Sequence, residues 1–298
     1  MSAGPADPRW SDWQPLAGYP AVTAEVLAET VDGGQAFRWH AQPDGTWFGQ
    51  WSEIVATLRL GADGRVAWRC PAGSETRTAA ALATYFGTDA DFPALTDALP
   101  WRTDAHLARC LRDFPGLRIL RQPFGETLLG FLCSATKQIV QIKQMQELLA
   151  ARHGAPVPGT GGAFRRLPTW PELAACTEAE LRACQLGFRA RYIWETAQFV
   201  AARPDWLRET ETLPYPEAKD RLLGLPGVGE KVADCVLLFG AGRLEAFPVD
   251  VWILKTLGRR YALDGWKPPQ LAQFGRAHFG PLAGLAQQFL FAWERRHG

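Results

Sequence analysis

Residues 225–235 read LPGVGEKVADC, a tight glycine-rich turn followed at once by a lysine in an apolar helix. A helical pattern over about 215–223 precedes the turn, and a second one begins at Glu230. Gly227 and Gly229 allow backbone conformations that are closed to other residues, and they leave the neighbouring amides unshielded. Together with the helix dipole, the free N–H groups that open the second helix form an anion site.

This pattern predicts a helix–hairpin–helix motif over about residues 215–240. Such a motif holds a DNA phosphate through the main chain of its turn, here Gly227, Val228 and Gly229, without reading a base. The alternative is an ordinary turn between two helices, because helical hairpins often contain glycine. The turn by itself does not separate the two interpretations.

Lys231 adds a second argument, because it stands among apolar neighbours in the helix that follows the turn. Desolvation disfavours the ammonium form of a lysine, and a neutral amine can attack carbon. The commoner fate of such a lysine is to extend past the apolar face into solvent. Asp250, in the segment FPVDV (247–251), brings a carboxylate to another apolar strip, where it would also cap the next helix.

The rest of the chain predicts an α+β fold. Residues 35–70 alternate short aromatic and β-branched runs with Pro-Asp-Gly and Ala-Asp-Gly turns, so we expect mostly strands and turns in the first hundred residues. From about Ala105 the apolar period becomes helical. We therefore predict an N-terminal antiparallel β-sheet domain over 1–104 and a multi-helix body over 105–298.

The helical body divides at several points. Residues 126–154 place apolar side chains at three- and four-residue spacing, and a Gly/Pro-rich connector follows at 154–164. Pro171 is expected in the first turn of one helix, and Thr177 is expected to open another. Further helices are expected over 186–202, 215–223, 230–240, 249–261, 268–279 and 281–296.

The composition is that of a soluble globular protein, with 47% hydrophobic and 21% charged residues. The net charge of +1 conceals a division along the chain: residues 1–100 hold 6 Arg or Lys and 12 Asp or Glu, whereas residues 101–298 hold 26 and 19. A basic second part indicates a face that binds a polyanion. Ordinary scatter of surface charge would give the same composition.

Several functional classes are disfavoured. The N-terminus lacks a basic stretch followed by an apolar run, so we expect no signal peptide, and no apolar segment approaches the ~20 residues of a membrane span. The six cysteines include no C-x-x-C pair, which argues against a zinc or iron–sulfur site and fits free thiols in a reducing cytosol. We expect a cytoplasmic, nucleoid-associated location if the source is bacterial and a nuclear one if it is eukaryotic.

Several separated segments of the sequence resemble motifs of the 8-oxoguanine DNA glycosylase/AP lyase branch of the helix–hairpin–helix DNA glycosylase superfamily. The resemblance covers most of the chain and lies in several segments in the same order. They are GGQAFRW (33–39), ILRQPFGETLLGFLCSATKQI (119–139), LGFRARYI (186–193), LPGVGEKVADC (225–235), FPVDV (247–251) and LAQQFLF (285–291).

The resemblance implies a bifunctional enzyme. Asp250 would stay ionised and stabilise the oxocarbenium charge that develops on the sugar as the glycosidic bond breaks. Lys231 would attack C1′, expel the base and form a Schiff base, after which β-elimination nicks the strand. Relatives that keep the aspartate but lack the lysine only excise the base, so Lys231 predicts lyase activity.

The lesion must leave the base stack before a pocket can read it. By family likeness, Cys235 and Phe291 would sandwich the flipped purine, and Gln287 would bond its Watson–Crick edge. The carbonyl of Gly34 would accept the N7–H that 8-oxoguanine carries and guanine lacks. Each residue also has a simpler interpretation: core for Cys235 and Phe291, surface amide for Gln287, turn glycine for Gly34.

Departures from the family pattern concern the opposite base. Where the branch has an Asn-Asn-Asn run facing the orphaned cytosine, this chain has Thr136, Lys137 and Gln138. Arg189 matches one cytosine-reading arginine, whereas the other position holds Gln141. The wedge position holds Phe188, which can still insert into the stack, and Trp252 stands where a histidine is usual. Lesion reading is therefore expected to be retained and opposite-base discrimination to be weak.

The expected partner is double-stranded DNA that contains an oxidised purine, bound by a monomer with no membrane contact. No cofactor is expected to be required; family analogy allows a monovalent cation at the carbonyls of hairpin 225–229. Two rivals stay open: a glycosylase of the superfamily for another damaged purine such as an alkylated base, and a non-catalytic DNA-binding module. No carboxylate or histidine cluster has the spacing of a metal-dependent nuclease.

Overall fold

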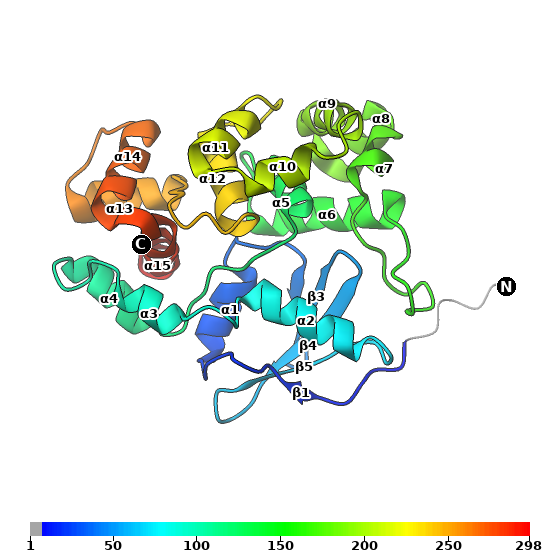
Figure 1. The fold of residues 1–298 in the computed structure, drawn as a ribbon, viewed down its shortest axis with the longest axis horizontal. Coiled ribbons are helices and arrows are strands. Elements are labelled where there is room, and N and C mark those ends of the chain that lie inside the picture. Colours follow the sequence, from blue (N-terminus) through cyan, green and yellow to red (C-terminus); the bar gives the residue numbers. More distant parts are fainter. Residues whose placement is uncertain (1–7) are drawn as a thin grey trace.

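The computed structural model describes residues 8–298, and its fold is an antiparallel sheet packed against a helical body (Figure 1). The sheet has the strand order β1-β5-β4-β3-β2, and all neighbouring strands are antiparallel. Its strands are β1 (Gln14–Pro15), β2 (Trp39–Ala41), β3 (Trp47–Trp51), β4 (Ile54–Leu60) and β5 (Val66–Arg69).

The turns of this sheet follow from the sequence. Gly45 and Gly64, the last residues of the Pro-Asp-Gly and Ala-Asp-Gly turns, have φ of 81° and 77°, in the left-handed region that glycine tolerates. Gly49 in β3 pairs with Trp39, and a Cβ at Gly49 would lie 2.3 Å from the indole of Trp39. The missing side chain therefore lets a fully buried tryptophan cross the sheet. The predicted meander is confirmed.

The prediction of mostly strands and turns in the first hundred residues was incomplete. Three helices also lie there: α1 (Ala24–Asp32), α2 (Glu75–Phe86) and α3 (Phe92–Asp97). Two of these helices begin at a side-chain cap: the side chain of Thr23 accepts a hydrogen bond from the amide of Val26, and that of Asp91 accepts one from the amide of Ala94.

The helical body begins at Ala105, and the predicted α+β class is confirmed. Thr177 caps α8 as expected, and Pro171 lies in the first turn of α7. The helices are α4 (Ala105–Asp113), α5 (Phe124–Leu132), α6 (Ile139–His153), α7 (Trp170–Ala174), α8 (Glu178–Leu181), the π-helical turn η1 (Arg182–Leu186), α9 (Arg189–Ala201), α10 (Trp206–Thr212), α11 (Tyr215–Leu223), α12 (Glu230–Phe239), α13 (Val251–Tyr261), α14 (Pro268–Phe279), the 3₁₀ turn η2 (Gly280–Leu282) and α15 (Ala283–His297).

The helical pattern over 126–154 is broken in the structure. Helix α5 ends at Leu132 and α6 begins at Ile139, with a turn of residues 133–138 between them. Thr136 in this turn has φ of 55°, a left-handed conformation that is costly for a β-branched residue. The apolar spacing runs across the turn because both flanking helices face the same core.

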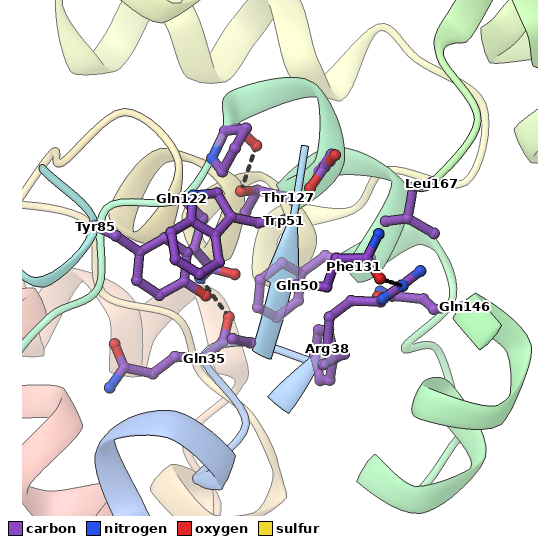
Figure 2. Close-up of a pocket in the computed structure, with 15 residues that line it drawn as sticks. Gln35, Arg38, Gln50, Trp51, Tyr85, Gln122, Thr127, Phe131, Gln146 and Leu167 are labelled. Carbon is purple, nitrogen blue, oxygen red and sulfur yellow. Dashed lines mark hydrogen bonds between the residues drawn. The ribbon is translucent and has the colours of Figure 1, made fainter. Parts of the chain in front are cut away.

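Hydrogen bonds of Gln35 and Gln122 join the loop before β2 to the segment before α5 (Figure 2). The side chain of Gln35 donates to the carbonyl of Arg118 at 2.8 Å and accepts from the amide of Leu120 at 2.9 Å. Gln122 in turn donates to the carbonyl of Gln35 at 2.6 Å. These bonds cross between segments more than 80 residues apart, so they fix the loop that carries Gly34 against the start of α5.

Candidate active site

The hairpin between α11 and α12 has the geometry that its glycines predict. Gly227 has φ of 76°, and a Cβ there would lie 2.6 Å from the ring of Tyr192, so the position requires glycine for two reasons. Gly229 is extended and exposed at the N-terminus of α12, and Val228 is buried beneath the turn. The first amides of α12 have no partner within the helix and open toward the surface.

A cluster of ion pairs, with Lys219 and Asp234 buried and Glu230 exposed, holds the two hairpin helices together. Lys219 on α11 lies 3.0 Å from Asp234 and 2.6 Å from Glu230, both on α12. Asp234 is 1% exposed and also accepts a 2.7 Å hydrogen bond from the hydroxyl of Tyr215. Because each charge is paired and hydrogen-bonded, the cluster fixes the helix pair, and with it the turn.

Lys231 points toward the end of α5. Its Nζ lies 3.4 Å from the hydroxyl oxygen of Ser134 and 4.9 Å from the ring centre of Phe131. The Ser134 hydroxyl donates its proton to the carbonyl of Phe131 at 2.7 Å, so its lone pairs face Lys231. The head group therefore contacts the end of α5 and does not simply extend to solvent.

Asp250 caps α13 and lies within electrostatic range of Lys231. Its Oδ1 accepts the amides of Trp252 and Ile253 at 3.0 and 2.9 Å, so the N-cap interpretation is confirmed. Burial raises the pKa of the Asp250 carboxyl above its ordinary value, while the Ile253 amide and the charge of Lys231 oppose the shift. Both capping bonds use Oδ1, which leaves Oδ2 for a ligand. The cap therefore fixes the position of a carboxylate that the charge of Lys231 influences.

The four residues predicted to read the base come from three segments. Cys235 lies one helical turn after Lys231 on α12, and burial raises the pKa of its thiol to about 12, so the sulfur is neutral. Gln287 and Phe291 lie one turn apart on α15. Gly34 has φ of 94°, and a Cβ there would lie 3.7 Å from the ring of Phe291. The structure thus brings the base of the α1–β2 loop against α15.

Gln287 supplies an independent sign of a binding site. Its side chain is 4% exposed, and within residues 8–298 no donor reaches its Oε1. A buried amide oxygen without a partner is costly, and such a group usually has a ligand or water to receive. The surface-amide interpretation of Gln287 was therefore wrong.

The predicted DNA-contacting residues divide into exposed and buried ones. Phe188, the wedge position, is 53% exposed, and Thr136 and Gln138 are exposed in the turn between α5 and α6, with Lys137 partly exposed between them. Arg189 is only 2% exposed. The structure does not present it on the surface as a base-reading contact requires.

Sequence reasoning missed Ser134, Phe131 and Ile139. Ser134 and Phe131 contact the Lys231 head group, and the side chain of Ile139 would lie 3.3 Å from a Cβ at Gly34. All three fall inside the segment 119–139, whose likeness to the family was noted without assigning them roles. Their signal is three-dimensional, because they meet their partners across about a hundred residues of chain.

The structure also bears on metal binding and on membrane crossing. In residues 8–298, no group of three or more His, Cys, Asp or Glu side chains is placed to hold a metal ion. Over the same residues, no helix has the length and apolar character that crossing a membrane would need.

Comparison with protein families gives two adjoining matches. A model described as 8-oxoguanine DNA glycosylase, N-terminal domain, matches residues 21–128, and one described as HhH-GPD superfamily base excision DNA repair protein matches residues 129–277. The two matches meet within α5. The predicted domain boundary at residue 104 marks the point where the apolar period of the sequence becomes helical, and it stays a prediction.

Named relatives and solved structures agree with these matches. The chain is 30% identical to the N-glycosylase/DNA lyase OGG1 of Arabidopsis thaliana over 91% of this chain and 78% of the relative. It is 30% identical to a probable N-glycosylase/DNA lyase of Methanothermobacter thermautotrophicus over 68% and 72%. An 8-oxoguanine glycosylase/lyase of Clostridium acetobutylicum, solved with DNA containing cytosine opposite 8-oxoG, superposes with a TM-score of 0.84 at 29% identity over 94% and 93%.

Proposed function

The chain belongs to the 8-oxoguanine DNA glycosylase/AP lyase branch of the HhH-GPD superfamily of base excision DNA repair proteins, and we therefore propose that it excises 8-oxoguanine from duplex DNA and nicks the strand. It is an enzyme with N-glycosylase and DNA lyase activities. The observation that carries the proposal is the position of Lys231 at the start of the helix that follows a hairpin shaped to hold phosphate, near enough to Asp250 for its charge to oppose the rise that burial causes in the pKa of that carboxyl. A non-catalytic DNA-binding module has no use for that pair.

The two groups divide the reaction between them. The lone pair of the Lys231 amine attacks C1′ while the C1′–N9 bond breaks, and the base leaves with those electrons and takes up a proton. The Asp250 carboxylate stabilises the positive charge that the sugar develops in this step. The sugar ring then opens to a protonated Schiff base, loss of a C2′ proton follows, and the 3′ phosphate is expelled.

Recognition of the base would use the four residues from three segments. Cys235 and Phe291 offer a thiol and a ring face to stack on the purine, and the unpartnered Oε1 of Gln287 can accept a hydrogen bond from its edge. The carbonyl of Gly34 would accept N7–H of 8-oxoguanine. Guanine would present a lone pair there and leave that carbonyl unsatisfied.

The test is a single-turnover assay on two duplexes that differ only in carrying 8-oxoguanine or guanine at one position. We expect base release and strand nicking on the 8-oxoguanine duplex, and a covalent complex when borohydride is present. Release of an alkylated purine in preference to 8-oxoguanine, without a covalent complex, would support the rival glycosylase instead.

Replacing Gly34 with alanine is expected to slow 8-oxoguanine excision at least tenfold. The new Cβ strains a backbone with φ of 94° and lies 3.3 Å from Ile139, where it narrows the base pocket. Nicking of a preformed abasic site should change little, because no base needs to be placed. Gly45→Ala is the matched control, since Gly45 has φ of 81° and open space around its Cβ.

Excision rates are expected to differ by less than about tenfold among duplexes with cytosine, thymine, adenine or guanine opposite the lesion. Arg189 is buried, and Gln141 places a short neutral amide, whose Oε1 accepts the amide of Gln138 at 3.2 Å, where the family has a second arginine. Single-turnover rates on the four duplexes measure this directly. A preference for cytosine of a hundredfold or more would contradict it.

We also propose that the hairpin carbonyls of residues 225–229 can take a monovalent cation. The segment LPGVG has no side-chain oxygen, so only main-chain carbonyls are available there, and these suit a weakly held potassium or sodium ion. Such an ion would tighten the turn around a DNA phosphate. Affinity for an uncleavable duplex in potassium, sodium and tetramethylammonium at equal ionic strength tests it.

A further inference from the structure

The turn of residues 133–138 is held in an unfavourable backbone conformation by hydrogen bonds from Arg189. Thr136 has φ of 55°, which a β-branched residue adopts only when its surroundings impose it. The Arg189 guanidinium lies under this turn: Nη2 donates to the carbonyl of Ala135 and to the hydroxyl of Thr136, the latter at 2.9 Å. Nη1 donates to the carbonyl of Leu186 at 3.2 Å.

Arg189 is also covered by the exposed ring of Phe188. Its guanidinium carbon lies 4.3 Å from the ring centre of Phe188, and the residue is 2% exposed. To reach a base, the side chain would have to break its three hydrogen bonds and leave the cover of the ring. A buried guanidinium with partners on both sides is part of the framework.

The same turn carries the residue that contacts the amine. Ser134 donates both its amide and its hydroxyl to the carbonyl of Phe131, at 3.0 and 2.7 Å, and its own carbonyl accepts the amide of Lys137 at 3.1 Å. These bonds leave the Ser134 hydroxyl oxygen turned to Nζ of Lys231 at 3.4 Å. A continuous set of contacts therefore runs from Arg189 through the turn to the amine.

We propose that Arg189 and Ser134 are positioning residues for Lys231: Arg189 holds the turn of residues 133–138, and Ser134 on that turn aims the amine at C1′. This assignment rests on the proposed Schiff-base function. It gives Arg189 a role that needs no opposite base, because its partners are protein carbonyls and a hydroxyl. A displaced nucleophile is costly, since misplacement by about 1 Å can lower a rate by about a hundredfold.

The experiment removes the opposite base. Two duplexes carry one abasic site, opposite either cytosine or a tetrahydrofuran spacer, and the rate of borohydride trapping is measured at saturating enzyme. Arg189→Ala and Ser134→Ala are each expected to trap about tenfold or more slowly on both duplexes, with affinity for an uncleavable analogue unchanged. Ser134→Thr, which keeps the hydroxyl, should restore the rate, and the double alanine variant should be no slower than the worse single one.

Other results would overturn the proposal. A base-reading Arg189 predicts a loss only on the cytosine duplex, and a purely structural Ser134 predicts equal losses in Ser134→Ala and Ser134→Thr. If Arg189→Ala does not fold, the Ser134 pair decides alone. If the wild type is trapped on the duplex with cytosine but not on the duplex with the spacer, the proposal is also wrong, because trapping would then depend on the opposite base. Failure of the wild type on both duplexes would instead refute the Schiff-base function.

Lys267→Ala is the control for loss of a surface side chain. Lys267 is exposed at the start of α14, outside the turn of residues 133–138 and outside the segments assigned to catalysis or DNA binding. Its loss should leave both the trapping rate at saturating enzyme and the affinity for the uncleavable analogue at the wild-type level.

Discussion

Lys231→Gln is expected to yield no covalent complex with borohydride and to lower strand nicking by about a thousandfold or more. Glutamine has nearly the length of lysine but no nucleophilic nitrogen, so no Schiff base can form and β-elimination has no intermediate to start from. Any 8-oxoguanine that the variant still releases should leave an intact abasic strand that breaks only on alkali treatment. A denaturing gel with and without alkali, run beside a trapping gel, measures both.

The matched control for this variant is Lys267→Gln, which removes an exposed lysine at the start of α14, away from Lys231 and from the segments assigned to DNA binding. It should trap normally once enzyme is saturating. Covalent capture by Lys231→Gln would show that another amine is the nucleophile. The folded state should tolerate the change, because the Lys231 head group makes one 3.4 Å hydrogen bond and one ring contact.

Asp250→Asn is expected to slow excision of 8-oxoguanine by roughly a thousandfold. A carboxylate about 4 Å from a developing positive charge contributes about 4 kcal/mol at an effective dielectric near 20, and a neutral amide does not replace it. Asparagine still caps α13, so the fold and the helix start are retained. Nicking of a preformed abasic site should fall less, because the glycosidic bond is already broken there. Equal losses on both substrates would contradict the assigned role.

The same variant should be more stable than the wild type at neutral pH. Burial raises the pKa of Asp250, so the folded state holds this proton more tightly than the unfolded chain does. The stability from the neutral carboxyl is present at low pH and is lost as pH rises through the raised pKa. The gain in melting temperature of Asp250→Asn should therefore shrink on acidification, and the acid limb of the excision rate should lie above the pKa of an ordinary aspartate.

What the sequence predicted well is what local chemistry determines. Position 227 has a positive φ and lies close to the ring of Tyr192, and both conditions require glycine. The glycine in the sequence therefore predicts the tight turn. Lys231 and Asp250 were identified because a charged residue within an apolar segment of sequence usually has a structural or catalytic role. The α+β class followed from the change of apolar period near Ala105, and the order of the motifs indicated the branch of the superfamily.

What it missed depends on tertiary partners. An arginine in LGFRARYI can extend to a base or fold inward, and only the carbonyls of Leu186 and Ala135 decide that Arg189 folds inward. The break between α5 and α6 is hidden because both helices share one apolar face. Ser134 has no signal of its own, since its partner Lys231 is 97 residues away. Helices such as α1 depend on a single cap, which spacing does not reveal.

The ion cluster beneath the hairpin has a consequence for measurements in different buffers. Surface contacts with the DNA backbone weaken as electrolyte is added, because counterions compete for the phosphates. Lys219 and Asp234 are 8% and 1% exposed, so dissolved ions barely reach the bond between them. We therefore expect the turn to keep its shape as salt is added, so the slope of log affinity against log salt concentration should report the phosphates that the Lys and Arg side chains of the whole protein neutralise.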